Sequence, residues 1–209
     1  MNKGGFSQIL SSKGQETIMT NLCGIRVAVL AADGFEETEL TEPVNALKEA
    51  GATVTIVGPK AGEIQGFRHD KKGAKVKVDR PIKEVKPDDF DAVQLPGGAL
   101  NADAMRMIPE VQSFLKSMHE AGKPIAAICH APWELVSAGL VKGRTLTSYY
   151  TIQDDIQNAG GAWLDREVVE DGNWVTSRQP KDLPAFNRAM LKLFAGRSAP
   201  EGNGSPGRA

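Results

Sequence analysis

The sequence predicts an α/β fold in which a mostly parallel β-sheet is covered by helices on both faces, giving a three-layer sandwich. Short apolar segments alternate along the 209 residues with segments of helical periodicity, which is the order of βαβ units. The apolar segments are rich in Val, Ile and Leu throughout, as strands buried on both faces are. In such folds the loops and helix N-termini meet at the carboxyl ends of the strands, so we expect the chemistry at that edge.

Each expected element has a local signal. The helix expected at 38–50 has Val44 and Leu47 on one face and ends at Gly51. Pro109 predicts the start of another helix, because proline lacks an N–H and this group has no partner in the first turn of a helix. The expected strands are residues 25–31, 53–57, 63–66, 75–78, 92–95, 124–128, 145–147 and 174–177. The expected helices are residues 38–50, 109–121, 152–158 and 182–193, with a further helix beginning at Pro132.

The composition indicates an ordinary soluble globular protein. Hydrophobic residues make up 41% and charged residues 24% of the chain, which excludes a fibrous or largely disordered protein. The 25 basic and 26 acidic residues leave a net charge of −1, so we expect neither nucleic acid nor an anionic membrane as a partner. The basic residues between 68 and 77 are interpreted as the solvated face of a hairpin. No apolar run approaches the ~18 residues that span a bilayer.

We divide the chain into a flexible N-terminal segment at 1–24, a single domain at 25–195 and a disordered C-terminal tail at 196–209. The tail is rich in glycine, proline and serine and cannot bury enough surface to order itself. Translation could start at Met1 or at Met19. Two cysteines and no recognisable secretory signal predict a reducing cytoplasm and no disulfide.

The residues around Cys129 predict a nucleophile at a strand-to-helix turn. A buried strand ends at Cys129, a helix with Pro132 in its first turn follows, and Ala127 and Ala131 provide the small neighbours that a sharp turn requires. The N-terminus of that helix would lower the pKa of the thiol and favour the thiolate. The alternative is that Cys129 is a small buried hydrophobic residue with no chemical role.

Two other strand ends carry polar or glycine-rich segments that should meet Cys129. Glu36 and Glu39 are three residues apart at a helix start, so they share a face. One of them, if desolvated near the sulfur, would stay protonated and donate a hydrogen bond or act as a general acid. Gly97 and Gly98 could present N–H groups to a developing oxyanion. The alternatives are acids that favour a helix N-terminus electrostatically and glycines that form a tight turn.

Histidines are scarce, which limits the choice of a base. The chain has three: His69 lies among turn and basic residues, His119 near the end of a helix, and His130 directly after Cys129. We therefore expect His130 to act with the thiol. A glutamine-amidotransferase-like triad requires a histidine far downstream of its cysteine, and none follows His130.

Five short motifs stand in a distinctive order along the chain. They are FEETEL at 35–40, LPGG at 95–98, AICHAP at 127–132, TSY at 147–149 and DGNWVTSR at 171–178. Together they resemble the PfpI-type proteins, the prokaryotic branch of the DJ-1 superfamily, over about residues 25–194. The resemblance implies a flavodoxin-like sandwich and an assembly that is a homodimer or a hexamer.

The resemblance also implies roles for the residues at the strand ends. Cys129 matches the nucleophile in a strained backbone, and His130 the adjacent histidine of the triad. Glu39 matches the family's acid that hydrogen-bonds the cysteine sulfur. The remaining matches are Glu36 as a neighbouring pocket acid, Tyr149 as a pocket tyrosine, and Gly97 and Gly98 as the oxyanion segment.

Two positions depart from the family pattern. The PfpI triad takes a Glu from the loop after Gly-Gly of a neighbouring subunit, and here no Glu stands at the matching position. Asp103, one residue on, is the nearby substitute. Trp133 replaces the more usual polar residue after Pro132, and we expect it to narrow or stack across the pocket mouth.

The resemblance implies a cytoplasmic stress-response protein, with an activated cysteine that acts on reactive carbonyls, as a glyoxalase or deglycase, or on oxidants. The missing Glu favours this chemistry over the alternative, an intracellular cysteine peptidase, because peptide hydrolysis requires an ordered base and a cleft that admits a chain. A non-enzymatic redox sensor or chaperone is a further alternative. We expect no metal and no cofactor; a flavin site is the weakest option.

Overall fold

The structure, a computed structural model, describes residues 20–196. Its centre is a seven-stranded sheet with the strand order β11-β12-β8-β7-β1-β3-β6. All neighbouring strands run parallel except β11 and β12, which form an antiparallel pair at one edge. The strands of this sheet are β1 (Arg26–Leu30), β3 (Thr53–Gly58), β6 (Arg80–Pro81), β7 (Ala92–Leu95), β8 (Ile125–Ile128), β11 (Val168–Asp171) and β12 (Trp174–Ser177).

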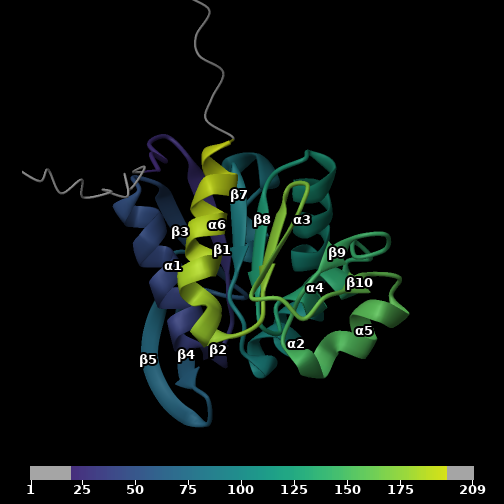
Figure 1. Ribbon diagram of the computed structural model, residues 1–209. Coiled ribbons are helices and arrows are strands. Elements are labelled where there is room, and N and C mark those ends of the chain that lie inside the picture. Colours follow the sequence, from purple (N-terminus) through teal and green to yellow (C-terminus); the bar gives the residue numbers. More distant parts are fainter. Residues whose placement is uncertain (1–19, 197–209) are drawn as a thin grey trace, which may run out of the picture.

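Helices cover both faces of this sheet (Figure 1). One face packs against α1 and α6, and the other against α2 to α5. The helices are α1 (Glu37–Glu49), α2 (Ala99–Arg106), α3 (Pro109–Glu120), α4 (Pro132–Ser137), α5 (Gln153–Asn158) and α6 (Leu183–Ala195). Four 3-10 turns complete the layers: η1 (Ile82–Glu84), η2 (Pro87–Asp89), η3 (Tyr150–Ile152) and η4 (Pro180–Asp182). The predicted α/β sandwich is confirmed.

Two small sheets lie beside the main one. In the first, β2 (Phe35–Glu36) and β5 (Lys71–Val78) flank β4 (Gly62–Arg68), and β4 and β5 form an antiparallel hairpin. In the second, β9 (Thr145–Leu146) pairs with β10 (Ala162–Trp163). The β4–β5 hairpin extends beyond the main sheet, on the side where the parallel strands of that sheet have their carboxyl ends (Figure 1).

Strand β8 shows why the central strands are apolar at every position. Ile125 and Ala127 belong to the core under α2 to α5, whereas Ala126 and Ile128 belong to the core under α1 and α6. Successive side chains of a strand point to opposite faces, so a strand covered on both faces has no polar side. The all-apolar pattern on which the sequence prediction depends therefore has this structural cause.

The structure contains elements that the sequence expectation lacks. They are helix α2, the strands β2, β6, β10 and β11, and the four 3-10 turns. Apart from α2, these elements are only two to four residues long, which is too short to show a periodic pattern. Leu22 was assigned to the flexible N-terminal segment, yet it is fully buried and its N–H donates to the carbonyl of Ala50. Residues 1–19 of that segment and the tail after residue 196 lie outside the described residues. No helix within residues 20–196 is long and apolar enough to cross a membrane.

Glu134 on α4 is an unusual core residue. It is 0% exposed, and neither of its carboxyl oxygens has a hydrogen-bond partner. Burial raises its pKa well above the ordinary value of 4.5, which favours the protonated carboxyl. A buried polar group without a partner costs about 1–3 kcal/mol, which makes Glu134 a weak point in the fold.

Replacing this carboxyl should stabilise the protein in a pH-dependent way. Folded Glu134 binds its proton more tightly than the unfolded chain does, so wild-type stability falls as the pH rises above 4.5 towards the raised folded-state value. We expect Glu134→Leu to raise the free energy of unfolding by about 1–3 kcal/mol at neutral pH. Glu134→Gln should match the wild type at pH 4.5 and exceed it at pH 8. Urea unfolding at both pH values tests this, and coincident curves for the wild type and Glu134→Gln at pH 8 would contradict it.

Candidate active site

The backbone at Cys129 adopts a strained left-handed conformation. Its φ is 64°, and His69 is the one other non-glycine among the described residues with a positive φ. The N–H of Cys129 donates to the carbonyl of Ser177 at 3.0 Å, and its own carbonyl accepts the N–H of Tyr149 at 2.8 Å. Non-glycine residues avoid this conformation, so such anchors must hold it in place. The chain then enters α4 with Pro132 in its first turn, as predicted.

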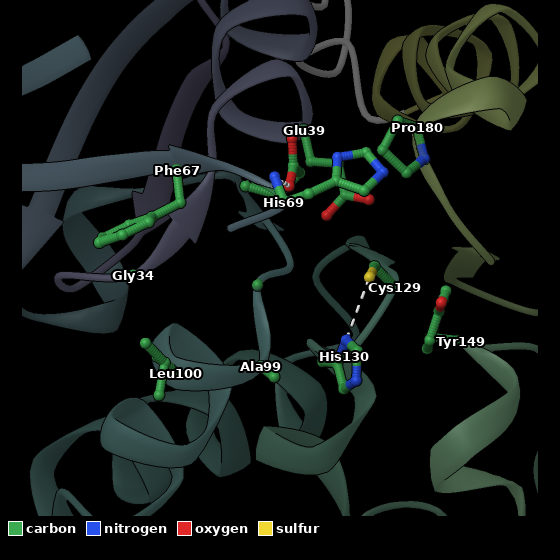
Figure 2. Close-up of a pocket in the computed structure, with 12 residues that line it drawn as sticks. Gly34, Glu39, Phe67, His69, Ala99, Leu100, Cys129, His130, Tyr149 and Pro180 are labelled. Carbon is green, nitrogen blue, oxygen red and sulfur yellow. Dashed lines mark hydrogen bonds between the residues drawn. The ribbon is translucent and has the colours of Figure 1, made fainter. Parts of the chain in front are cut away.

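A cavity of about 260 Å³ opens above this turn, at the carboxyl ends of β1, β7 and β8. Figure 2 shows its lining, with the sulfur of Cys129 between His130 on one side and His69 on the other. Most of the site residues predicted from the sequence line this cavity. The lining residues are Gly34, Glu36, Glu39, Phe67, His69, Gly98, Ala99, Leu100, Cys129, His130, Tyr149 and Pro180.

Glu39 is a fully buried carboxyl group beside the sulfur. A Cβ on Gly97 would stand 2.2 Å from its Oε2 and 2.5 Å from the Cβ of Cys129, so glycine leaves the space that brings the two groups together. Burial, and next the nearby charge of Glu36, raise the pKa of Glu39 well above 4.5. This shift favours the protonated form of Glu39, which can donate a hydrogen bond.

The ionisation of Cys129 is coupled to that of Glu39. Burial raises the pKa of the thiol, and an ionised Glu39 would raise it further, whereas the N–H groups of Gly98 and His130 lower it. The sequence prediction considered the helix N-terminus alone and missed the cost of burial. Hydrogen bonds from Cys129 and from the N–H of Gly97 favour an ionised Glu39, whereas the N–H groups of Gly98 and His130 favour a thiolate. The pair holds at most one negative charge, and thiol chemistry requires that charge on the sulfur, with Glu39 protonated.

His130 contacts the sulfur directly. Its Nδ1 lies 3.2 Å from Sγ of Cys129, and its Nε2 lies 3.2 Å from Oγ1 of Thr151. Burial lowers the pKa of His130, so the imidazole is neutral at neutral pH and can accept the thiol proton. The ring stacks on Tyr149 with centroids 4.8 Å apart.

Trp133 does not lie where the sequence predicted. It is absent from the lining of the cavity, and its ring lies beside His130, with centroids 5.8 Å apart. The guanidinium of Arg106 covers its ring at 5.1 Å. Because Trp133 is part of α4 and points toward α2, it supports the imidazole and does not narrow the mouth.

Glycine is required at position 98 by close packing. Its φ is 95°, and a Cβ there would stand 2.2 Å from the carbonyl oxygen of Gly34. The absence of a side chain lets the N–H of Gly98 face the sulfur of Cys129. Gly98 thus presents one N–H to the cavity, while Gly97 provides the space for Glu39.

Glu36 and Glu37, at the start of α1, form hydrogen bonds with the β4–β5 hairpin. Oε2 of Glu36 accepts the N–H of His69 at 3.0 Å. The carboxylate of Glu37 accepts hydrogen bonds from Arg68 and from the N–H of Ala74, each at 2.6 Å. These contacts carry His69 into the cavity lining. The sequence correctly places His69 in a turn, but its contact with Glu36, 33 residues away, leaves no local pattern that predicts a position in the site. Position 36 therefore lines the cavity and also anchors the hairpin.

Helix α2 carries Asp103 and the structural residue Asn101. Asp103 is exposed and does not line the cavity of its own subunit; its expected role toward a neighbouring subunit stays a prediction. Asn101 is fully buried; its Oδ1 accepts the N–H of Ala32 at 2.7 Å, and its Nδ2 donates to the carbonyls of Pro96 and Gly97. Asn101 thus ties the end of β1 to the glycine loop. Among the described residues, no group of three or more His, Cys, Asp or Glu side chains is arranged to hold a metal.

Comparisons with known proteins agree with this geometry. Residues 25–193 match the DJ-1/PfpI family. Deglycase TK1284 of Thermococcus kodakarensis is 47% identical over 170 residues, covering 81% of this chain and 99% of that protein. General stress protein 18 of Bacillus subtilis is 41% identical, covering 82% of this chain and 98% of that protein. The crystal structure of Drosophila melanogaster DJ-1beta has a TM-score of 0.75 and 33% identity, covering 82% of this chain and 91% of that one.

Removing the carboxyl of Glu39 should make the thiol less reactive. If Glu39 is protonated, Glu39→Leu removes a donor to the thiolate, and we expect at least about tenfold slower alkylation of Cys129 by iodoacetamide at neutral pH. Glu39→Gln keeps a hydrogen-bond donor, so its alkylation rate should fall less than that of Glu39→Leu. Glu42→Gln, an exposed position on the same helix, is the matched control. Faster alkylation in Glu39→Leu would show instead that Glu39 is ionised and repels the thiolate.

Proposed function

The chain belongs to the DJ-1/PfpI family, and we propose that it is a thiol-dependent hydrolase of reactive carbonyl compounds, of the glyoxalase or deglycase type, with Cys129 as nucleophile. The observation that carries the proposal is the placement of one sulfur at the base of a cavity, between a buried acid and a neutral imidazole. The names of TK1284 as a deglycase and of the Bacillus relative as a stress protein support a role in carbonyl stress.

The geometry supports a simple first step. The thiol proton passes to Nδ1 of His130, 3.2 Å away, and the sulfur adds to the aldehyde carbon of a substrate such as methylglyoxal. The carbonyl oxygen takes up the electron pair and becomes an alkoxide that the N–H of Gly98 and the proton of Glu39 stabilise. Protonation of this oxygen yields a hemithioacetal on Cys129.

The later steps require a base and water. The hydrogen on the former aldehyde carbon leaves as a proton to the imidazole and returns to the adjacent carbonyl carbon, giving a 2-hydroxyacyl thioester. Water hydrolyses the thioester, releasing the 2-hydroxy acid and restoring the thiol. The sum is one aldehyde and one water converted to one hydroxy acid, with no oxidant and no cofactor required.

The size of the cavity and the surroundings of His130 favour this chemistry over peptide hydrolysis. About 260 Å³ suits a small carbonyl or a single modified side chain. Within its own subunit the second partner of the His130 ring is the hydroxyl of Thr151 and not an acid, so a peptidase triad would need an acid from a neighbouring subunit. Cys23 and Cys129 are both free thiols, which is consistent with a reducing compartment such as the cytoplasm.

An oxidant is the second candidate substrate, because the same sulfur could become a sulfenic or sulfinic acid. The protonated Glu39 beside it would then donate a hydrogen bond to the oxidised sulfur. Peroxide treatment followed by mass spectrometry distinguishes the two reactions. Oxidation consumes one thiol per molecule, whereas hydrolysis leaves the thiol intact after many turnovers.

Methylglyoxal turnover tests the proposal directly. We expect the wild-type protein to convert many equivalents of methylglyoxal to lactate. In Cys129→Ser the turnover rate should fall at least about 100-fold, because a hydroxyl is a far weaker nucleophile than a thiol at neutral pH. Cys23→Ser, which removes the exposed thiol, should keep full activity. Consumption of no more than one equivalent by the wild type would contradict the proposal.

A further inference from the structure

The imidazole of His130 uses both of its nitrogens. Nδ1 lies 3.2 Å from the sulfur of Cys129, and Nε2 lies 3.2 Å from the hydroxyl of Thr151. We propose that Thr151 is a positioning residue, whose hydroxyl takes the place that an acid holds in a Cys-His-acid triad and keeps Nδ1 of His130 facing the sulfur. This inference rests on the proposed function, because it assigns a part in the same thiol chemistry.

The backbone around Thr151 is anchored to the Cys129 turn although the threonine itself is exposed. Tyr149, directly before η3, donates its N–H to the carbonyl of Cys129 at 2.8 Å. Ile152, at the end of η3, is fully buried and donates its N–H to the carbonyl of Tyr149. Thr151 is thus placed between two anchored residues, and its distance from His130 is set by the same hydrogen bond that holds the strained cysteine.

Aromatic packing alone cannot select the orientation of the imidazole. Tyr149 stacks on the ring of His130 at an interplanar angle of 30°, and Trp133 lies beside it at 57°. These contacts limit the tilt of the ring, but a half-turn about the Cβ–Cγ bond exchanges nitrogen and carbon edges with almost no change in packing. The hydrogen bond to Thr151 distinguishes the two orientations, since only one of them presents Nε2 to Oγ1.

A hydroxyl suits a histidine that receives the thiol proton. In the neutral imidazole that accepts this proton at Nδ1, the proton on Nε2 is donated to Oγ1 of Thr151. After the transfer the imidazolium carries a proton on each nitrogen and still donates Nε2–H to the same oxygen. A carboxylate would accept the same bond but would stabilise the imidazolium. Thr151 therefore holds the ring in both protonation states without adding charge.

No acid competes for this position within the described part of the chain. The hydrogen bonds of the His130 ring go to Cys129 and Thr151. Glu36, Glu39 and His69 line the same cavity as His130. The other titratable groups near the ring are Cys129 beside it, Tyr149 stacked on it, and Arg106 beyond Trp133.

The test compares three substitutions of Thr151 in a Cys23→Ser background, so that Cys129 is the one thiol. Thr151→Val keeps the shape and removes the hydroxyl, Thr151→Ser keeps the hydroxyl, and Thr151→Asp supplies a carboxylate. Thr53→Val, at an exposed threonine of β3, is the matched control. The readouts are the alkylation rate of Cys129 from pH 5 to 9 and the NMR titration of the His130 ring, neither of which requires turnover of a substrate.

We expect Thr151→Val to slow alkylation at neutral pH by about three- to tenfold, the effect of one lost hydrogen bond, and Thr151→Ser to stay within about twofold of its parent. In Thr151→Asp the pKa of His130 should rise by about one unit or more, because the carboxylate favours the imidazolium. A Val variant with the parent's rate and ring spectrum would overturn the proposal, as would a Ser variant as slow as Val. Absence of methylglyoxal turnover in the parent would contradict the proposed function, but it would not affect the comparison of alkylation rates and ring spectra among the Thr151 variants.

Discussion

The left-handed backbone of Cys129 is the constraint on which the rest of the site depends. A non-glycine residue at a φ of 64° costs on the order of 1–2 kcal/mol, so the surrounding structure must impose it. Ser177 accepts its N–H from the neighbouring strand β12, and Tyr149 donates to its carbonyl. The turn aims the sulfur at Glu39 and sends the following imidazole toward Thr151. One strained residue thereby sets the positions of the acid, the base and the partner of the base.

The acids of the FEETEL motif divide into two kinds. Glu36 and Glu37 accept hydrogen bonds from the β4–β5 hairpin, and these contacts bring Phe67 and His69 to the cavity. Glu39, two residues on, is fully buried and lacks regular hydrogen-bond partners. Adjacent carboxyl groups therefore differ because of burial and partners and not because of their chemistry, which explains how one short motif serves both structure and reaction.

Much of the fold follows from local patterns in the sequence. The apolar segments ending at Leu95 and Ile128 and the proline that begins α4 are strong signals, because burial on both faces and helix starts leave marks on adjacent residues. The convergence of Glu39, Gly98 and Cys129 follows once the strands are known to be parallel. In contrast, Asn101 acts on a backbone group 69 residues away, and Thr151 on a ring 21 residues away. Such contacts leave no local pattern, and neither does the burial that raises the pKa of Cys129.

The protonation state of Glu39 is the most direct test of this account. A carboxylic acid that keeps its proton can stabilise a thiolate, whereas a carboxylate in the same place would oppose it. The measurement is the infrared difference spectrum between the wild type and Glu39→Gln at neutral pH. The account predicts that the substitution removes the band of a protonated carboxyl group. Loss of a carboxylate band instead would contradict it, because the negative charge would then lie on Glu39 and not on the sulfur.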